Sequence, residues 1–337
     1  MAEDFLQLSS RDRLDALGYV EAESGRPVHL LEKDVWVVWA LATLFNAPVG
    51  KHLVFKGGTS LSKAYDAIRR FSEDVDLTYD IRALLPDVVS HRGDALPPNR
   101  SQERRWTRMI RGRLDETIAK EIVPVLEHAI HHARLPAVIR VEGANVYLDY
   151  EAVAGGSGYV NPSVMLEFGA RATGEPFALR NIRCDAADHL HQLEFPQALS
   201  KVMRVERTFW EKATAIHVFC CGGRLRGHRI ARHWYDLYCL DATGHAQPAI
   251  QSRDLAAAVA RHKSLFFPEK DASGQAVNYH EAVRGALQLV PNGRAREVLA
   301  VDYGRMVDDG LLLDDALAFD ELMLGCRQLE RRANLLG

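Results

Sequence analysis

Hydrophobic and polar positions repeat along this chain with two periods, one typical of helices and one typical of strands. Residues 6–17 and 31–44 carry their apolar positions at helical spacing. Short apolar runs at 52–56 and 74–79 flank a helical pattern at 59–68. The pattern therefore predicts two helices followed by a strand–helix–strand unit.

The remaining pattern divides the chain near residue 195. Residues 86–100 contain several prolines and predict a loop, and a long helical pattern then runs from 102 to 132. Three strand-like runs follow, at 137–141, 145–150 and 164–168. From Phe195 onward the pattern is almost wholly helical. We expect an α+β fold with two domains, an α/β domain at residues 1–194 and a mainly helical domain at residues 195–337.

Two short motifs in the first strand–helix–strand unit indicate chemistry. The first apolar run ends at Gly57 and Gly58, which open the helical pattern, and a helix N-terminus attracts phosphate. The second run carries Asp74 and Asp76, and residues two apart on a strand point to the same face. Two adjacent carboxylates resist joint ionisation unless a cation neutralises them. Together the motifs predict Mg²⁺ holding a nucleoside triphosphate.

Composition narrows the class of protein without changing this picture. The 337 residues are 47% hydrophobic and 26% charged, which is typical of a globular protein. A net charge of −3 gives no overall attraction for nucleic acid, so RNA binding would need local basic patches. The five cysteines are scattered, with no CxxC pair, as in reduced cytosolic proteins. The N-terminus has no signal-peptide pattern, and the longest apolar stretch, 35–45, is too short to cross a membrane. We therefore expect a cytoplasmic protein.

The residues around these motifs resemble a known superfamily. Phe55-Lys-Gly-Gly-Thr-Ser-Leu-Ser-Lys-Ala-Tyr65, followed by Arg70-Phe-Ser-Glu-Asp-Val-Asp-Leu77, resembles the signature of DNA-polymerase-β-like nucleotidyltransferases. More narrowly, it resembles the AbiEii/AbiGii group, which includes MenT-type toxins. Members of that group are toxins of bacterial toxin–antitoxin and phage abortive-infection pairs. The resemblance continues at Glu206-Arg-Thr-Phe-Trp-Glu-Lys212, at His233-Trp-Tyr-Asp-Leu237 and weakly at Asp302-Tyr-Gly-Arg-Met306. It implies a polymerase-β-like nucleotidyltransferase domain, a small mixed sheet with flanking helices, whose active site a helical C-terminal domain completes.

Two Mg²⁺ ions would need a third carboxylate beside Asp74 and Asp76. Glu167 is the best candidate, because it is the one charged residue within an apolar strand and a buried strand tolerates an unpaired charge poorly. Its position also matches the third acidic strand of the resembling family. Alternatively, Glu167 lies on a solvated face or pairs with Arg171, and Asp149 competes for the same role.

Lys212 and Asp236 are polar residues on otherwise apolar helical faces. Lys212 lies on the stripe formed by Phe209, Ala213 and Ile216, so it either extends to solvent or meets an anionic partner. Asp236 could equally make a structural hydrogen bond. The resemblance places both in the active site, with Lys212 on the β- or γ-phosphate and Asp236 orienting Lys212 or contacting the base or ribose. It makes neighbouring His233 a supporting or substrate-facing residue.

The glycine motif and its neighbours carry two further expectations. Gly57, Gly58, Thr59 and Ser60 are expected to bind the triphosphate, through the backbone N–H groups of residues 58–60 and the hydroxyls of Thr59 and Ser60. This is not a Walker A loop, because no Gly-Lys-Ser/Thr follows. Ser72 matches a serine that some members of the resembling family use for regulatory phosphorylation, and a phosphate there would oppose triphosphate binding through its negative charge.

Two basic clusters could hold an RNA backbone, although each could equally be a solvated surface. The first lies on one helix face near Trp106 and consists of Arg104, Arg108 and Arg111. The second crowds a glycine-containing loop and consists of Arg224, Arg226, His228, Arg229 and Arg232. His217 and Cys221 lie one helical turn apart, but without two more ligands at zinc-finger spacing we reject a zinc site.

These observations predict a Mg²⁺-dependent nucleotidyltransferase. An RNA 3′-OH would attack the α-phosphate of an NTP, and pyrophosphate would leave. The resemblance makes tRNA the first candidate acceptor. The resemblance also implies a cognate antitoxin as partner. Three alternatives stay open: transfer to a protein or small-molecule hydroxyl, a non-catalytic module that senses NTP or binds a partner, and a structural helical protein.

Overall fold

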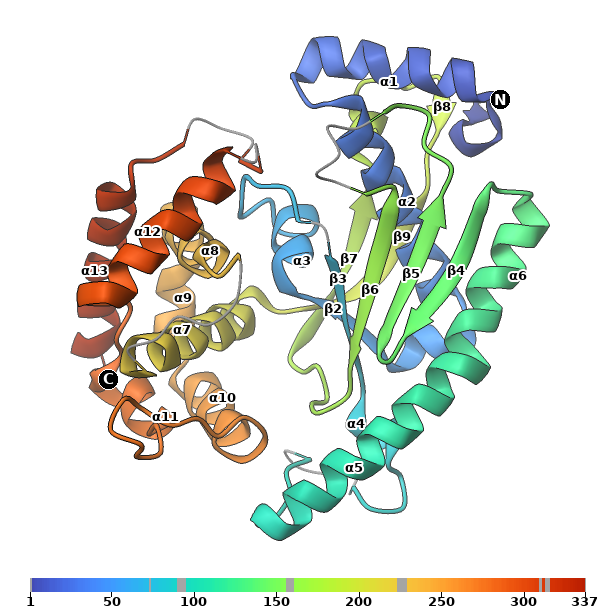
Figure 1. Cartoon of the computed structure of the whole chain (residues 1–337). Helices are drawn as coiled ribbons and strands as arrows, with labels where there is room; N and C mark the ends of the chain where they lie inside the picture. The colour runs from blue at the N-terminus through green and yellow to red at the C-terminus, as the bar shows by residue number, and fades with distance from the viewer. Residues whose placement is uncertain are drawn as a thin grey trace. The chain divides into compact units, whose positions relative to one another are not determined.

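The computed structural model describes residues 2–72, 74–89, 95–155, 161–222, 229–308, 311–312 and 316–336 (Figure 1). The chain divides into two compact units. Unit 1 comprises Met1–Ala64, Phe71–His91 and Arg108–Met203, and unit 2 comprises Tyr65–Arg70, Arg92–Thr107 and Arg204–Gly337. Two short segments from the first half of the sequence therefore belong to the unit that contains the C-terminus.

Unit 1 is built on strands with a few helices. Its helices are α1 (Ser10–Ser24), α2 (Val28–Asn46), α3 (Gly57–Lys63), α4 (Ile81–Leu84) and α6 (Val123–Ala133). Its strands are β1 (Glu3–Asp4), β2 (Leu53–Lys56), β3 (Asp74–Tyr79), β4 (Ala137–Glu142), β5 (Asn145–Tyr150), β6 (Ser163–Gly169), β7 (Phe177–Arg183), β8 (Leu193–Glu194) and β9 (Gln197–Met203). Helix α5 (Arg100–Thr117) has residues in both units. Short 3₁₀ or π-helical segments of unit 1 occupy Phe5–Gln7, Pro48–His52, Ile118–Ile122 and Asp185–Asp188, and a further π-helical segment, Ala282–Ala286, lies in unit 2.

The described strands of unit 1 form a seven-stranded mixed sheet in the order β4-β5-β6-β3-β2-β9-β7, with a separate parallel pair of β1 and β8. Strands β3 and β6 are parallel, as are β2 and β9, and the other neighbours are antiparallel. A mixed sheet with flanking helices is what the sequence predicted, so the α+β expectation is confirmed.

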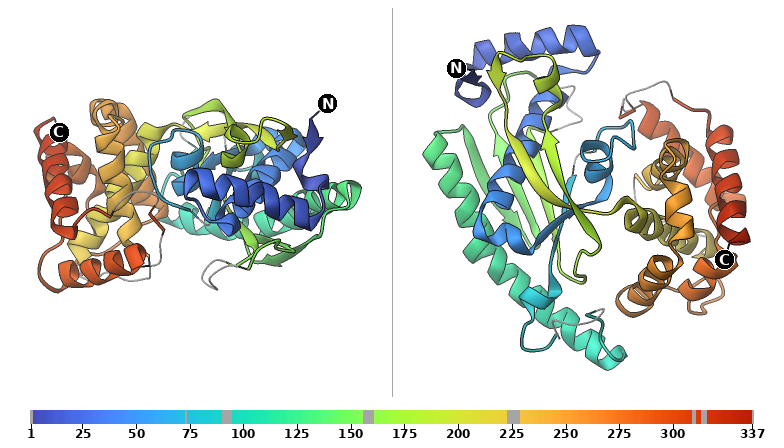
Figure 2. Two further views of the ribbon diagram at one scale, coloured as in Figure 1. Left: turned by 90° about the horizontal axis from the view of Figure 1, so that it is seen from above. Right: turned by 180° about the vertical axis from the view of Figure 1, so that it is seen from behind.

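Helix α2 covers one face of this sheet (Figure 2, right). Its inward residues Val35 and Trp36 are fully buried, and the Trp36 ring stacks on Tyr150 of β5 with centroids 5.1 Å apart. On the strands, alternate residues such as Val75 and Leu166 are fully buried on the same side. The period of two thus separates a covered, apolar face from the opposite face of the sheet, which α2 leaves uncovered.

Two predicted helices differ from the observed ones. The pattern at 59–68 gives only α3, because the chain leaves the helix after Lys63 and Asp66 is left-handed (φ 46°). The pattern at 102–132 gives α5 and α6 separated by the π-helical segment Ile118–Ile122. Pro124 in the first turn of α6 has no N–H to donate and accounts for this break.

Unit 2 is helical in its described residues from Val205 onward. It contains α7 (Val205–Gly222), α8 (Ala231–Ala242), α9 (Ala246–Gln251), α10 (Arg253–Phe266), α11 (Tyr279–Glu281), α12 (Gly293–Asp308) and α13 (Phe319–Leu335). Its core holds the fully buried Trp210 and Trp234, whose indole N–H groups donate to Ala249 O (2.8 Å) and Leu289 O (2.7 Å). The helical pattern expected from Phe195 starts later than predicted, because β9 occupies 197–203 and belongs to unit 1.

A search of the described helices for membrane spans found none with the length and hydropathy to cross a bilayer.

Candidate functional site

Gly57 is the point at which the glycine motif meets the aspartate motif. Its backbone is left-handed (φ 79°), and a Cβ atom there would lie 1.9 Å from Asp76 Oδ2 and 2.7 Å from Asp76 Cγ. Glycine is therefore required both for the backbone conformation and for the close approach of the carboxylate. The sequence predicted both motifs, but their direct contact is visible only in the tertiary structure.

Asp74 and Asp76 lie on the face of β3 that α2 leaves uncovered. Along β3, Val75 and Leu77 are fully buried, whereas the two aspartates between them are half-buried. The parallel register pairs Asp76 with Glu167 on β6, whose side chain is exposed. Since neighbouring strands lie about 4.8 Å apart, all three carboxylates come from adjacent positions on one face. The spacing predicted the shared face of Asp74 and Asp76, whereas Glu167 lies on an exposed face, which the sequence had left open as an alternative to burial.

Asp149, the competing third carboxylate, is engaged elsewhere on the same sheet. Its Oδ2 accepts from Arg140 Nε at 3.0 Å, and its Oδ1 accepts from the hydroxyl of Ser163, its register partner. Glu167 is opposite Asn145, at the other end of the β5–β6 pairing. The geometry therefore favours Glu167 as the residue that accompanies the two aspartates.

The three carboxylates are hard oxygen donors of the kind that Mg²⁺ prefers. Within the described part of the chain, however, no group of three histidine, cysteine, aspartate or glutamate side chains is close enough to hold a metal ion. Asp74, Asp76 and Glu167 thus share a face without forming a preassembled cage. Their chemistry fits a divalent cation, and their side chains would have to converge when it binds.

The hydroxyls of Thr59 and Ser60, expected to bind triphosphate, point into the protein. Thr59 Oγ1 donates to the backbone carbonyl of Asp74, and Ser60 Oγ donates to Gly57 O at 2.9 Å. Both side chains are buried. Thr59 thus ties the start of α3 to the start of β3, and the backbone of Gly57 and Gly58 is the part of the motif left to meet a phosphate.

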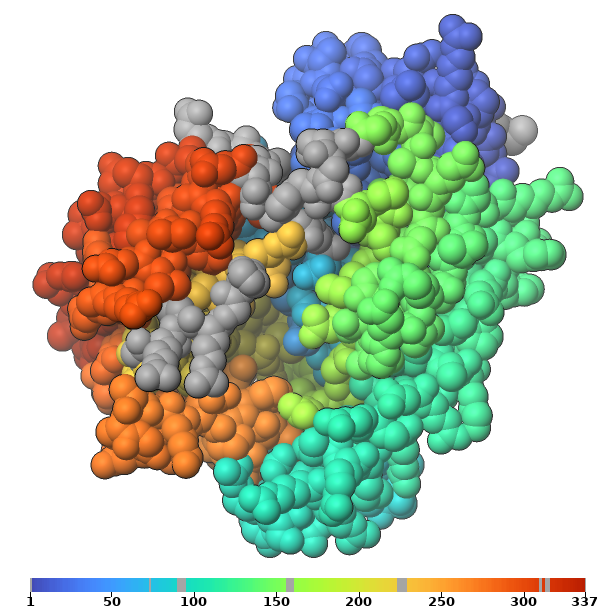
Figure 3. Space-filling model, viewed as in Figure 1, coloured from blue at the N-terminus to red at the C-terminus, as the bar shows by residue number. Residues whose placement is uncertain are grey.

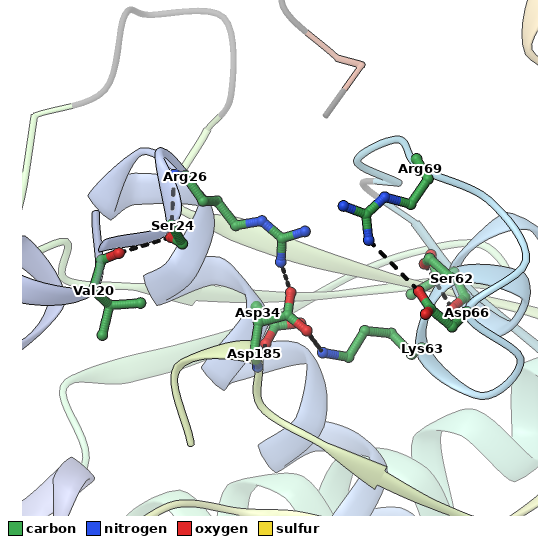
Figure 4. A network of polar contacts seen from close by, with 10 residues as sticks. Val20, Ser24, Arg26, Asp34, Ser62, Lys63, Asp66, Arg69 and Asp185 are labelled. Atoms are coloured by element: carbon green, nitrogen blue, oxygen red, sulfur yellow. Dashed lines mark hydrogen bonds and ion pairs between the residues drawn. The ribbon is translucent and has the colours of Figure 1, made fainter. Parts of the chain in front are cut away.

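A partly buried ion-pair network holds the other end of α3 (Figure 4). Lys63 Nζ lies 2.7 Å from Asp34 Oδ1 on α2 and 2.7 Å from Asp185 Oδ1, and Arg26 also pairs with Asp185. The backbone N–H of Asp185 donates to Asp34 Oδ2 at 2.7 Å. Since α3 is fixed at both ends, Gly57 is held firmly against Asp76. Sequence reasoning missed this network, because its members are far apart in the chain.

Lys212 meets its anionic partner within unit 2. Its Nζ lies 2.7 Å from Oδ2 of Asp236, which is fully buried on α8. The stripe residues Phe209, Ala213 and Ile216 are also fully buried, so Lys212 faces the core of the unit as its position on the helix indicated.

Asp236 has a second cationic partner, Arg70, which sequence reasoning did not identify. Arg70 Nε donates to Asp236 Oδ1 at 2.6 Å, and Arg70 Nη2 donates to Asp236 Oδ2 at 2.9 Å. Burial by itself would raise the pKa of the Asp236 carboxyl, but Arg70 and then Lys212 outweigh it and hold that pKa below its ordinary value. The available signal was the place of Arg70 in the same sequence block as the two strand aspartates.

His233 is an uncharged neighbour of this cluster. Burial, followed by the positive charge of Lys212, lowers the pKa of the imidazole to about 3. Its Nδ1 is buried and has no hydrogen-bond partner within the described residues. The ring therefore adds no positive charge beside Lys212.

The first basic cluster is a surface of α5. Arg104, Arg108 and Arg111 are exposed on this helix, whose residues are drawn in teal in Figure 3. Trp106 is buried instead and cannot stack on a base. Arg113, on the same helix, donates two bonds to Asp87. The cluster is thus suited to phosphate groups rather than to bases.

The structure describes Ser72 and part of the second basic cluster. Arg224, Arg226 and His228 lie outside the described residues, whereas Arg229 and Arg232 lie at the start of α8 or just before it. Ser72 is half-buried two residues before the start of β3, and its carbonyl lies 3.5 Å from Thr59 Oγ1.

His217 and Cys221 are neighbours on α7, as their spacing predicted. Cys221 Sγ lies 3.4 Å from His217 Nε2, and His217 Nδ1 accepts from the backbone N–H of Gln288 at 3.1 Å. Burial lowers the pKa of His217 to about 4. The imidazole therefore has a structural hydrogen bond, and no third ligand joins the pair within the described residues.

Comparison with solved structures found matches at low sequence identity. The crystal structure of JHP933 from Helicobacter pylori is 15% identical, with 92% of this chain and 93% of that chain covered and a TM-score of 0.44. MenT4, a nucleotidyltransferase toxin from Mycobacterium tuberculosis H37Rv, is 17% identical, with 95% and 98% covered and a TM-score of 0.43. A comparison with curated proteins found no significant match.

A match to a protein family carries the assignment. The family described as nucleotidyl transferase AbiEii toxin, type IV toxin–antitoxin system, matches residues 39–324. That range includes the glycine motif, the aspartate strand, Glu167, Lys212 and Asp236. Because the match spans most of the chain, this protein belongs to the AbiEii family of nucleotidyl transferase toxins.

Proposed function

We propose that this chain transfers a nucleotide from an NTP to the 3′ end of an RNA and releases pyrophosphate, with tRNA as the first candidate acceptor. The observation that carries the proposal is the contact between Gly57 and Asp76 on a sheet face that also presents Asp74 and Glu167. In a nucleotidyl transferase family, that contact joins the element suited to phosphate with the element suited to a cation.

The carboxylates of unit 1 would hold the metal. Asp74, Asp76 and Glu167 would bind Mg²⁺, and Mg²⁺ when bound would neutralise the triphosphate and lower the pKa of the attacking hydroxyl. The chain itself supplies positioning. Gly57 allows the Asp76 carboxylate to approach the start of α3, where the backbone of Gly57 and Gly58 would orient phosphate oxygens.

Unit 2 would supply a cation for the triphosphate. The Lys212 ammonium has three donors, and Asp236 is its one side-chain partner within the described residues. Two donors can therefore serve the β- or γ-phosphate. Asp236 is fully buried and would act by orienting Lys212 rather than by contacting the base.

The arginines of α5 favour RNA over a protein or small-molecule acceptor. Arg104, Arg108 and Arg111 recur at helical spacing, so their side chains form one exposed row suited to successive phosphates. Replacing all three by glutamine should weaken RNA binding, measured without NTP, and lower its log–log salt slope by about 2, roughly 0.7 per lost single-strand contact. Arg113→Gln is the matched control, since Arg113 already pairs with Asp87. An unchanged salt slope would remove this support for RNA.

The reaction can be tested directly. The purified protein is incubated with total RNA, Mg²⁺ and each labelled NTP, alongside the Asp74→Asn and Asp76→Asn variants. We expect label on the 3′ end of RNA with the wild type only, because each variant removes a carboxylate ligand. Label on protein instead would support a protein acceptor, and NTP binding without any product would support a sensing module.

The family implies a cognate antitoxin as the protein partner and a nucleotide as substrate. For a toxin that blocks tRNA, aminoacylation is the step we expect to fail. Expression without the antitoxin should then arrest bacterial growth only while Asp74 is intact.

A further inference from the structure

Arg70, Asp236 and Lys212 form a buried group in unit 2 in which two cations share one carboxylate. The exposed fractions are 4% for Arg70, 0% for Asp236 and 8% for Lys212. Arg70 binds both carboxylate oxygens, at 2.6 and 2.9 Å, and Lys212 Nζ lies 2.7 Å from Oδ2. The three side chains together carry a net charge of +1.

The segment that carries Arg70 is fixed to its surroundings in unit 2. The Tyr235 hydroxyl donates to the carbonyl of Arg69 at 3.2 Å, and the backbone of Arg70 forms an antiparallel bridge with Leu312. A planar guanidinium that is held this way and binds both oxygens allows one orientation of the carboxylate. Asp236 is thus held in place by Arg70 independently of Lys212.

This arrangement changes what Lys212 can do. If Asp236 had Lys212 as its only partner, the two would form a closed neutral pair, and the carboxylate would offset the charge of the lysine. Because Arg70 also binds the carboxylate, Asp236 can orient the ammonium without cancelling the positive charge of the group. Lys212 keeps two donors for another anion.

We propose that Arg70 is a positioning residue that neutralises and orients Asp236, so that Lys212 presents its ammonium to the triphosphate of the NTP. This inference rests on the proposed function, in which Lys212 binds the β- or γ-phosphate. Arg70 itself does not touch the nucleotide. Its location in the block that leads into Asp74 and Asp76 means that one short sequence segment carries residues for both the cation and the phosphate.

Tripolyphosphate is the probe, because it carries the charge of the NTP without base, ribose or reaction. Its dissociation constant is measured by calorimetry for the wild type, Lys212→Ala, Arg70→Gln and Arg70→Lys. Arg69→Gln is the matched control, because Arg69 is the adjacent arginine and its side chain is 55% exposed. We expect Lys212→Ala and Arg70→Gln each to weaken binding at least tenfold, Arg70→Lys to recover part of the loss, and Arg69→Gln to bind as the wild type does.

A double variant separates positioning from direct contact and avoids an unpaired buried carboxylate. If Arg70 acts through Asp236, Arg70→Gln/Asp236→Asn should bind tripolyphosphate more tightly than Arg70→Gln alone. Equal weakness of the two would overturn the inference, because it would mean that Arg70 contacts the phosphate directly. Wild-type affinity in Arg70→Gln, with Lys212→Ala still impaired, would overturn the inference and leave the proposed function standing. If the wild type fails to bind tripolyphosphate, the phosphate role of Lys212 and the inference fall together.

Discussion

Replacing Gly57 by alanine should disable the site while leaving most of the fold intact. The new Cβ would lie 1.9 Å from Asp76 Oδ2, whereas an ordinary contact of this kind is 3.4–4 Å. The carboxylate therefore has to move by more than an ångström. A misplacement of about 1 Å can cost roughly 100-fold in rate, so we expect a loss of about 100-fold or more in nucleotide transfer.

The same substitution also carries a backbone cost, which a control can isolate. An L-residue in the left-handed region costs about 1–2 kcal/mol, which lowers the melting temperature by about 2–8 °C for units of 150–250 residues. Gly25 has nearly the same φ (71°), at the end of α1, with nothing within 4 Å of an added Cβ. Gly25→Ala should therefore show the thermal shift without the loss of activity.

The assay combines labelled-NTP transfer with thermal unfolding of both variants. The reasoning predicts similar melting temperatures for Gly57→Ala and Gly25→Ala and activities that differ by about 100-fold. If Gly57→Ala retains near-normal transfer, the placement of the Asp76 carboxylate against Gly57 is irrelevant to the chemistry. A loss of activity that merely tracks unfolding in both variants would contradict the prediction equally.

Three further changes test other parts of the structure. Lys212→Ala should lower kcat/KM by about 10–150-fold, because it removes one charge-assisted contact worth about 1.5–3 kcal/mol, and it should change the melting temperature little. A variant that is destabilised but fully active would show that Lys212 is merely structural. Burial raises the pKa of Glu32 to about 7, although a backbone N–H bond from Val153 partly offsets it. The folded state therefore binds the proton more tightly than the unfolded state, so wild-type stability should fall relative to Glu32→Gln as pH rises from 4.5 to 7. The fall should be about 3 kcal/mol at most. A difference in the free energy of unfolding between wild type and Glu32→Gln that stays constant across this pH range would refute the prediction. Ser72→Glu should weaken NTP binding while Ser72→Ala should not, because only the former adds charge beside the carboxylates; equal affinities would exclude a regulatory role for this serine.

Local pattern was enough to predict the elements that present the carboxylates. The period of two in residues 74–79 placed Asp74 and Asp76 on one face, and the lone charge at Glu167 in an apolar strand marked the neighbouring position. The first inference depends only on the alternation of side chains along a strand, which short-range geometry imposes, whereas the choice of Glu167 also drew on its match to the third acidic strand of the resembling family. Helical spacing likewise placed Lys212 on the inward face of its helix, because the helical period is also set by short-range geometry.

What Lys212 and the glycine motif contact was decided only by the tertiary structure. The partner of Lys212 is Asp236, which Arg70 holds from a segment 166 residues earlier in the sequence, and no local pattern encodes such a pairing. The hydroxyl of Thr59 turned inward because Asp74, the first residue of the next strand, supplied a backbone carbonyl as its acceptor. Periodicity shows which side of a helix or strand faces the core, whereas the group that contacts that side depends on how the whole chain packs.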